Sequence, residues 1–324
     1  MIYLHDGHIR DIGINWHELT YVVESTLRSS AAGNCVHPLK PYLRYGDRAN
    51  RIIAMPAYVG EPLHLAGIKW IASFPGNHAL GLPRAHNTLL LNDASTGKPT
   101  AFFQSGLLNC LRTAAVSGVM TTAFLKARPL EKLRVGIIGW GPIGRAHLEM
   151  FIGLFEDRLD QVMIYDLKPV AAESIPESVR SITLIADYWQ SVYRESAICA
   201  TCTVSPERYI DQAPPRGSLL LNVSLRDYLP ESVSSLKAVV VDDWQEICRE
   251  NTDIEQLHLT CGLREEDAIL LEDVVCGSGL ADYASSDEPV FFNPMGLAVF
   301  DIAIAGHYLQ EAVRLGAGVV LEDG

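Results

Sequence analysis

The stretch LRVGIIGWGPIGRAHLEMFIGLF, residues 133–155, has the pattern of a strand, a glycine-rich turn and a helix, and QVMIYD, residues 161–166, follows as a second strand. Glycines let the turn bend tightly and let its backbone approach a pyrophosphate at the start of the helix. A carboxylate that ends the second strand binds ribose hydroxyls and repels a 2′-phosphate. The stretch therefore predicts a site for NAD in preference to NADP, built from Gly139, Trp140, Gly141, Pro142, Ile143, Gly144 and Asp166. Lys168 softens that preference, and the alternative is a structural turn that binds nothing.

Three further apolar runs extend this pattern: SAICATCTV at 196–204, GSLLLNVS at 217–224 and KAVVVDD at 237–243. Runs rich in β-branched residues and separated by helical segments are typical of a parallel sheet that is covered on both faces. We therefore expect a Rossmann-type parallel-sheet domain for NAD over residues 118–292.

The rest of the chain mixes helix and strand signals. Helical periodicity marks residues 16–30 and 107–125, and strand patterns mark 51–59, 65–74 and 86–93. The apolar segment 293–316 predicts a buried helix with Asn293 as its N-cap and Pro294 as its first residue. We expect this helix to pack against the domain that the N-terminal part of the chain forms. The fold class is therefore α/β: the Rossmann-type domain is joined to an α+β domain formed by residues 1–117 and 293–324.

Bulk properties narrow the function classes. The chain has 324 residues, which suits two domains, and a formal net charge of −13, which argues against general binding to nucleic acid or anionic membranes. The first residues carry charges and no apolar run, so we expect neither a signal peptide nor a membrane anchor. Seven scattered cysteines favour a reducing, cytoplasmic location, and the spacing of the ten histidines predicts no metal site.

Cations concentrate in the N-terminal part of this acidic chain. Between Pro38 and Arg84 six cationic residues accompany two acidic ones, and Arg112 follows in CLRTAAVS. Arginine forks suit carboxylates, so the cluster predicts a site for a small substrate with several negative groups. The six cations are Lys40, Arg44, Arg48, Arg51, Lys69 and Arg84, of which Arg48 is expected on a solvated face.

Lys69 stands in AGIKWIASFP, residues 66–75, inside a run that otherwise has the pattern of a buried strand. Alternation along a strand places Lys69 on the opposite face from Ile68 and Trp70. Because lysine is almost never fully buried without a partner, either that face is wet or an anion binds there.

Six segments together resemble the ornithine cyclodeaminase/μ-crystallin family, and they occur in the family's order: IAMP, GIKWIASFP, LRTAAVS, GIIGWGPIG, TVS and NPMGLAVFD. The resemblance covers essentially the whole chain. It implies a metal-free protein with a substrate-binding and dimerisation domain, a Rossmann domain for NAD(P), and assembly as a homodimer.

Four segments, HPLKPYLR, RIIAMP, GIKWI and VVVDDW, are similar to one branch, the N-(2-amino-2-carboxyethyl)-L-glutamate dehydrogenases. That resemblance implies NAD-dependent oxidative hydrolysis to L-2,3-diaminopropionate and 2-oxoglutarate, for siderophores or peptide antibiotics. Ornithine cyclodeaminases carry a glutamate for the distal ammonium of ornithine two positions before the Met-Pro, at the place assigned here to Ala54. Arg44 and Arg51 nearby suit a small amino-acid substrate with several carboxylates.

The resemblance also implies roles for individual residues. Arg44, Lys69 and Arg112 match the carboxylate-binding residues, and Asp227 matches the catalytic aspartate, which would stabilise an iminium and activate water. Lys69 is either a base or an electrostatic clamp. The chain departs from the family in having Leu225 and Arg226 before the aspartate.

The remaining expectations concern the cofactor and one buried acid. Thr113 is expected to reach the cofactor phosphate. Asp301 is either a buried hydrogen-bonding post or part of the site. The residues expected to line the dinucleotide crevice are Thr203, Val204, Ser205 and Ser224.

Two other functions stay open. One keeps the enzyme fold but changes the reaction, to ornithine cyclodeamination or to reduction of an imino acid such as a ketimine. The other is a binding protein loaded with NAD(P)H that performs no turnover.

Overall fold

The computed structural model describes residues 1–47 and 49–322, so Arg48 lies outside the described residues. The chain divides into two compact units. Unit 1 comprises Met1–Arg112 and Gly296–Gly324, and unit 2 comprises Thr113–Met295. Helix α3 (Gly106–Ala127) carries both Arg112 and Thr113, so the chain passes from one unit to the other within a single helix.

Unit 1 is an α+β unit. Its other elements are β1 (Ile2–His5), α1 (Asp6–Ile12), α2 (Trp16–Ala31), β2 (Cys35–Val36), β3 (Tyr42–Leu43), β4 (Arg51–Val59), β5 (Leu65–Ser73), β6 (Ala85–Asp93), β7 (Pro99–Gln104), α11 (Ala298–Leu315) and β16 (Val319–Val320).

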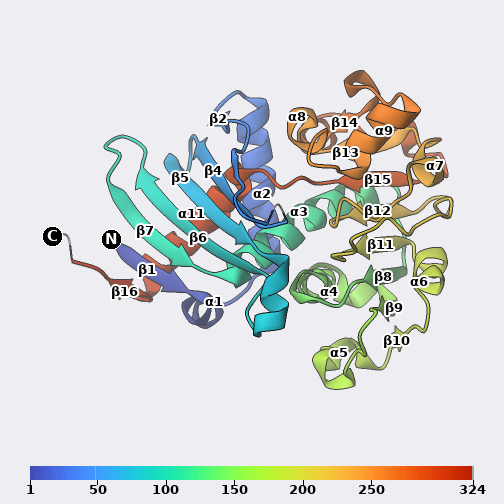
Figure 1. Ribbon diagram of the computed structural model, residues 1–324, viewed down its shortest axis with the longest axis horizontal. Coiled ribbons are helices and arrows are strands. Elements are labelled where there is room, and N and C mark those ends of the chain that lie inside the picture. Colours follow the sequence, from blue (N-terminus) through green and yellow to red (C-terminus); the bar gives the residue numbers. More distant parts are fainter. Residues whose placement is uncertain (48, 323–324) are drawn as a thin grey trace. The chain divides into compact units, whose positions relative to one another are not determined.

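The sheet of unit 1 has the strand order β16-β1-β7-β6-β5-β4-β2, with β3 also paired to β4. Its long central strands, β4 to β7, are antiparallel, as their alternating patterns lead one to expect. Helix α11 packs against β4, β5 and β6 and against α2, as Figure 1 shows. The prediction that the C-terminal helix is buried in the first domain is therefore confirmed.

The predicted start of that helix is wrong. Asn293 is the last residue of strand β15 (Val290–Asn293), where it pairs with Val241, and its side chain donates to the Phe291 carbonyl at 3.0 Å. Gly296 has a φ of +82°, which is not helical, and α11 begins only at Ala298. A strand end and a left-handed glycine therefore replace the first predicted turn.

Unit 2 is an α/β unit. After α3 its elements are β8 (Leu133–Ile138), α4 (Pro142–Phe155), β9 (Leu159–Tyr165), α5 (Glu177–Arg180), β10 (Thr183–Ile185), α6 (Trp189–Glu195), β11 (Ile198–Thr201), β12 (Leu219–Asn222), α7 (Pro230–Val233), β13 (Ala238–Val241), α8 (Trp244–Ile247), α9 (Asp253–Cys261), β14 (Ile269–Leu270), α10 (Leu271–Cys276) and β15.

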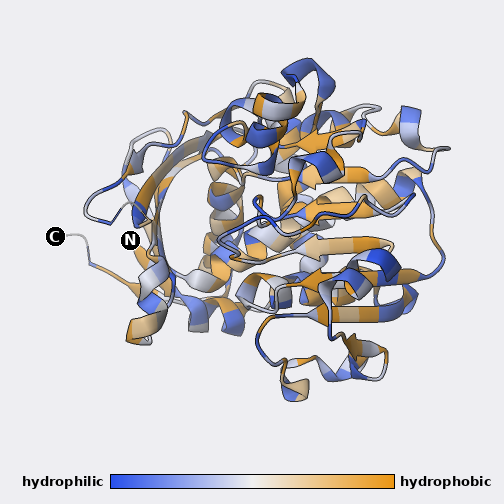
Figure 2. Cartoon of the chain, turned by 45° about the vertical axis from the view of Figure 1, so that its right-hand side comes forward, coloured by the Kyte–Doolittle hydropathy of each residue, from blue (hydrophilic) through white to orange (hydrophobic). Residues whose placement is uncertain are grey.

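The sheet of unit 2 has the order β10-β9-β8-β11-β12-β15-β13-β14, and every recorded strand pair in it is parallel. All four residues are buried in each of β11, β12, β13 and β15, and these strands are strongly hydrophobic in Figure 2. Strands buried on both faces are typical of parallel sheets covered by helices. The predicted fold class is therefore confirmed. In the part of the chain that the structure describes, no helix is long and apolar enough to cross a membrane.

Candidate active site

Lys69 is buried in unit 1, with a relative exposure of 3%, whereas its neighbour Trp70 is 42% exposed. The register pairs Lys69 with Met55 on β4 and with Leu89 on β6, which are both buried. Lys69 therefore lies on the inner face of the sheet, the face that packs against helix α11, and not on a wet face.

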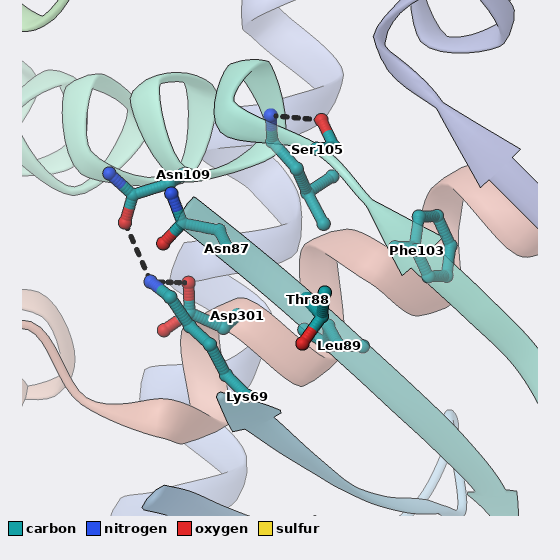
Figure 3. Close-up of a pocket in the computed structure, with 9 residues that line it drawn as sticks. Lys69, Asn87, Thr88, Leu89, Phe103, Ser105, Asn109 and Asp301 are labelled. Carbon is teal, nitrogen blue, oxygen red and sulfur yellow. Dashed lines mark hydrogen bonds and ion pairs between the residues drawn. The ribbon is translucent and has the colours of Figure 1, made fainter. Parts of the chain in front are cut away.

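The anion that pairs with Lys69 is supplied by the chain itself. The Lys69 Nζ donates to Asp301 Oδ1 at 2.9 Å and to Asn109 Oδ1 at 2.6 Å (Figure 3). Arg112 Nε donates to the same Asp301 oxygen at 2.9 Å. Two cations from β5 and α3 thus share one carboxylate from α11, and the cluster keeps an excess of one positive charge at neutral pH.

Burial governs the ionisation of this cluster. Desolvation lowers the pKa of Lys69 to about 8; Arg112 and Lys40 act in the same direction and Asp301 opposes them. Burial alone would raise the pKa of Asp301, but Arg112 and Lys69 together hold it below its usual range. At pH 7 both Lys69 and Asp301 are therefore ionised, although the pKa of Lys69 lies well below that of an exposed lysine.

Gly296 makes room for Arg112. A Cβ at position 296 would lie 2.4 Å from the guanidinium of Arg112, and the φ of +82° is one that L side chains rarely adopt. The glycine in NPMGLAVFD therefore lets the arginine reach Asp301 on the helix that follows.

Lys69, Asn109 and Asp301 line a small pocket in unit 1, together with Asn87 and Ser105 (Figure 3). The predicted substrate-binding residues differ in their relation to this pocket. Lys69 and Arg112 belong to one ion-pair cluster. Arg44 is exposed, and its guanidinium lies 5.3 Å from the centre of the Tyr42 ring.

The cross-strand register also corrects the assignment of Ala54 to the position where ornithine cyclodeaminases carry their ammonium-binding glutamate. Ala54 pairs with Trp70, on the outer face of the sheet, so its side chain points away from Lys69. Ile53 and Arg51 alternate onto the inner face that carries Lys69. The position before the Met-Pro that lies on the inner face with Lys69 is therefore Ile53, which is likewise uncharged.

In unit 2 the glycine turn follows β8 and opens α4, as predicted. Gly139 has a φ of +101°, and a Cβ there would lie 2.7 Å from the Cys202 backbone. A Cβ at Gly144 would lie 2.1 Å from the Gly139 carbonyl oxygen, so helix and turn pack as closely as glycine allows. A Cβ at Gly141, the N-cap of α4, would meet nothing within 4 Å. The turn therefore leaves free approach to its helix N-terminus, as a pyrophosphate requires.

Asp166 lies directly after β9 and is tied to the same turn. Its Oδ2 accepts from the Trp140 backbone N–H at 2.7 Å, and its Oδ1 accepts from the Lys168 backbone N–H at 2.8 Å. The carboxylate thus stands beside the glycine turn, where a ribose would be held next to a pyrophosphate. Pro142 and Ile143 begin α4, in its first turn. Together these residues fit the dinucleotide that the sequence predicts.

Asp227 is completely buried in unit 2, and three hydroxyl groups surround its carboxylate. Thr203 Oγ1 donates to Oδ1 at 2.6 Å, and Ser224 Oγ and Tyr209 OH donate to Oδ2 at 2.5 and 3.3 Å. Burial raises the pKa of Asp227, and the three hydroxyl hydrogen bonds only partly offset this effect. The loops after β11 and β12 thus bring together Thr203, Ser224 and Asp227.

The other predicted crevice residues lie beside this group. Ser205 has its backbone N–H 3.3 Å from Thr203 Oγ1, and Val204 is 64% exposed after the end of β11. Thr113 is half-buried on α3 as the first residue of unit 2.

Pattern reasoning missed a second buried acid. Asp253 is 1% exposed; its Oδ1 accepts from Arg208 at 2.7 Å, and its Oδ2 accepts from Asn222 at 2.9 Å and from the Asp227 backbone N–H at 3.1 Å. Leu225, with a φ of +65°, donates its N–H to Asn222 Oδ1 and accepts at its carbonyl from the Asp253 N–H. This network fixes the unusual Leu225-Arg226 loop, and nothing in the local sequence signals it.

Asn109 and Asn87 were also missed. Asn109 precedes Arg112 by three residues in the predicted helix, a spacing that places both on one helix face. That spacing was the available signal. In the part of the chain that the structure describes, no group of three or more His, Cys, Asp or Glu side chains is arranged to hold a metal ion.

Comparisons with known proteins agree with this architecture. The model of the Ornithine cyclodeaminase/mu-crystallin family matches residues 10–315. The N-((2S)-2-amino-2-carboxyethyl)-L-glutamate dehydrogenase of Staphylococcus aureus is 33% identical, over 99% of this chain and 98% of that protein. A Delta(1)-pyrroline-2-carboxylate reductase of Bacillus cereus is 26% identical, over 95% of this chain and 96% of its own length.

Among solved structures, the Delta(1)-pyrroline-2-carboxylate reductase of Thermococcus litoralis, in complex with NADH and L-proline, superposes with a TM-score of 0.83. The match covers 99% of this chain and 100% of the other at 22% identity, and it shows that the two share a fold.

Proposed function

Because the chain belongs to the ornithine cyclodeaminase/mu-crystallin family, we propose that it is an NAD-dependent dehydrogenase acting on N-((2S)-2-amino-2-carboxyethyl)-L-glutamate. The observation that carries the proposal is the 33% identity to the Staphylococcus aureus dehydrogenase over 99% of this chain. The products are L-2,3-diaminopropionate and 2-oxoglutarate, and the first is a building block for a siderophore or peptide antibiotic.

The reaction oxidises the secondary amine at the glutamate Cα and hydrolyses the resulting iminium. Bound NAD⁺ supplies the acceptor for the hydride. Water adds to the iminium carbon, the C–N bond breaks, and the nitrogen leaves on diaminopropionate. One substrate, one NAD⁺ and one water thus give diaminopropionate, 2-oxoglutarate, NADH and a proton.

In unit 1 the cationic cluster binds the substrate. Lys69 donates to Asp301 and Asn109, and the ammonium keeps a third N–H for a substrate carboxylate. Arg112 uses only part of its guanidinium on Asp301 and Asn109. Arg51, on the inner sheet face, and Arg44 add cations for the further carboxylates of this substrate.

In unit 2 Asp227 acts as the general base. A buried carboxylate with a raised pKa is suited to accept a proton from attacking water. Thr203 and Ser224 are half-buried and hydrogen-bonded to it, so their hydroxyls are the route by which a fully buried Asp227 exchanges that proton. The negative charge of Asp227 also stabilises a developing iminium.

The cofactor is held by unit 2. The residues assigned to it are the turn from Gly139 to Gly144, Asp166, Thr113 and the crevice residues Thr203, Val204, Ser205 and Ser224. The unobstructed Gly141 supports a dinucleotide, and the placement of Asp166 beside the turn supports NAD over NADP.

We also propose that the protein is a cytoplasmic homodimer. The described residues include all seven cysteines and contain no disulfide, which supports a reducing compartment. On the outer face of the unit 1 sheet, Trp70 is 42% and Leu43 51% exposed. Exposed apolar side chains of this size favour a second copy of the chain as their cover.

Imino-acid reduction is the second candidate, and the match to the Bacillus cereus reductase over 95% of this chain favours it. We rank imino-acid reduction second because the identity to this reductase is 26%, against 33% to the Staphylococcus aureus dehydrogenase. The number of cations in unit 1 also suits a substrate with several carboxylates better than a cyclic imino acid.

The test is to incubate the protein with NAD⁺ and N-((2S)-2-amino-2-carboxyethyl)-L-glutamate while recording NADH absorbance and identifying the amino-acid products. We expect NADH, diaminopropionate and 2-oxoglutarate in equal amounts. Parallel samples contain ornithine with NAD⁺ and pyrroline-2-carboxylate with NADH. Turnover of a parallel sample alone would replace the proposed reaction, and no turnover in any sample would favour the non-catalytic binding protein.

An Asp227→Asn variant tests the catalytic aspartate. The change preserves side-chain volume and removes the charge, so we expect kcat to fall by at least about a hundredfold, the lower range for loss of an acid–base group. The control is Asp267→Asn, at an exposed carboxylate paired with Arg264, which should keep its turnover. Full turnover of Asp227→Asn would remove the assignment.

A further inference from the structure

Two buried oxygen atoms in the unit 1 pocket have no donor among the described residues. They are Asp301 Oδ2 and Asn87 Oδ1. Asp301 is only 1% exposed, so this carboxylate oxygen is withdrawn from bulk water. Both residues line the same pocket (Figure 3).

The fold brings the two acceptors to one side. Asn87 on β6 pairs across the sheet with Ile71 on β5, and Ile71 is two residues from Lys69, so Asn87 and Lys69 share the inner face. Asp301 approaches that face from α11, which packs on β5 and β6. Figure 3 shows the amide of Asn87 on the same side of the pocket as the Lys69 amine and the Asp301 carboxylate.

The neighbouring cations do not satisfy these atoms. Lys69 and Arg112 both donate to the other oxygen of Asp301, Oδ1. A buried acceptor without a donor costs free energy, and the cost is larger for an ionised carboxylate. A donor for these two oxygen atoms therefore has to come from solvent or from a bound ligand.

We propose that Asp301 Oδ2 and Asn87 Oδ1 form a subsite for a protonated primary amine. A primary ammonium brings several N–H donors and a positive charge that complements the carboxylate. Water brings O–H donors but no charge. Lys69 and Arg112 take the adjacent carboxylate of the same ligand, so the subsite recognises the ammonium and carboxylate of an α-amino acid.

The charges agree with such a ligand. Lys69, Arg112 and Asp301 carry one excess positive charge, which the carboxylate of the ligand neutralises. Its ammonium then lies against Asp301 Oδ2, while Lys69 and Arg112 remain on Oδ1. Asp301 therefore separates the incoming cation from the two resident ones.

This inference rests on the proposed function, because the aminocarboxyethyl arm of the proposed substrate carries such an ammonium and carboxylate on one carbon. It deepens that function by assigning substrate selectivity. A cyclic imine has no primary ammonium for Asp301 Oδ2, so the subsite disfavours pyrroline-2-carboxylate.

The test compares two ligands that differ only in the amine: N-((2S)-2-amino-2-carboxyethyl)-L-glutamate and N-(2-carboxyethyl)-L-glutamate. Isothermal titration without NAD⁺ measures binding in the absence of turnover. We expect wild-type protein to prefer the amine-bearing ligand by at least about tenfold, as for a hydrogen bond to a charged group. Asn87→Ala should reduce that preference to about threefold or less and leave Kd for the deamino ligand unchanged.

The control is Asn92→Ala on the same strand, whose side chain donates to Gly97 in the hairpin turn; it should keep the wild-type preference. Asp301→Asn should also lose the preference, but it breaks the Lys69 and Arg112 pairs. Its fold is therefore checked by thermal melting, and Asn87→Ala is the deciding variant.

Three results are decisive when NADH formation is recorded separately. Preferential binding of the amine-bearing ligand without NADH would end the proposed function and leave the subsite standing. NADH formation with equal preference in wild type and Asn87→Ala would end the subsite and leave the function standing. Failure of both ligands to bind would end the subsite.

Discussion

At the scale of the residue, Lys69 shows how a fold handles a buried cation. Desolvation lowers its pKa to about 8, and Asp301 opposes the shift without cancelling it. The ammonium is therefore retained at neutral pH by one carboxylate and one amide, Asn109. That arrangement favours the clamp over the base among the two roles open to Lys69, because the clamp needs the protonated form.

The pH dependence of kcat/KM separates these roles. Protonated Lys69 predominates below pH 8, so a clamp loses its charge as pH rises through about 8, and we expect kcat/KM to fall there. A base would give the opposite slope, with kcat/KM rising through the same interval. Lys69→Arg retains its charge well above pH 8, so in a folded variant the decline should move to higher pH.

The sequence identified the buried cations better than it identified the groups that pair with them. The buried cations could be inferred because Lys69 and Arg112 interrupt apolar runs, a local signal. The partner of Lys69 could not be identified, since Asp301 is 232 positions away and only the packing of α11 on β5 brings them together. The prediction for Ala54 was wrong for a related reason, because a face assignment needs the register that Met55 and Lys69 define.

At the scale of the element, two glycines of the turn between β8 and α4 are needed for different reasons. Gly144 is required by packing, since a Cβ would lie 2.1 Å from the Gly139 carbonyl, whereas the Cβ position of Gly141 is open. Stability and cofactor binding should therefore respond to different substitutions.

Gly144→Ala should destabilise the protein without cofactor by about 1–3 kcal/mol, as overpacking does. Gly141→Ala should melt like wild type but bind NAD⁺ at least about tenfold more weakly, because the methyl group occupies the approach of the pyrophosphate. Thermal melting without cofactor and titration with NAD⁺ measure the two effects. Wild-type NAD⁺ affinity in Gly141→Ala would contradict this interpretation of the turn.

Strands and helices with strong periodicity were predictable, and those without it were not. β4, β5 and β6, and the parallel strands β8, β9, β11, β12 and β13, follow from their patterns. Asn293-Pro294 is a good capping pair and therefore favours a helix start, but sheet pairing of β15 with Val241 overrides that local preference. The network around Asp253 depends on three separate segments, so no window of sequence contains it.

At the scale of the whole molecule, the proposed dimer predicts a molar mass in solution twice the 35.6 kDa of one chain. Trp70→Glu places a charge on the outer sheet face and should shift sedimentation toward the single chain. Leu259→Glu, at a leucine that is 66% exposed in unit 2, is the matched control and should leave the mass unchanged. A Trp70→Glu protein that sediments like wild type would exclude this face as the interface.

Unit 1 is made from both ends of the chain, whereas unit 2 is a continuous stretch. During synthesis from the N-terminus, every residue of unit 2 is therefore made before Asp301, which belongs to the C-terminal segment of unit 1. Until α11 appears, Lys69 and Arg112 lack the carboxylate that allows them to be buried, and the inner sheet face must stay hydrated. The pocket lined by Lys69 and Asp301 is thus completed only by the C-terminal segment, and a chain that ends before residue 301 contains all of unit 2 but lacks the carboxylate of that pocket.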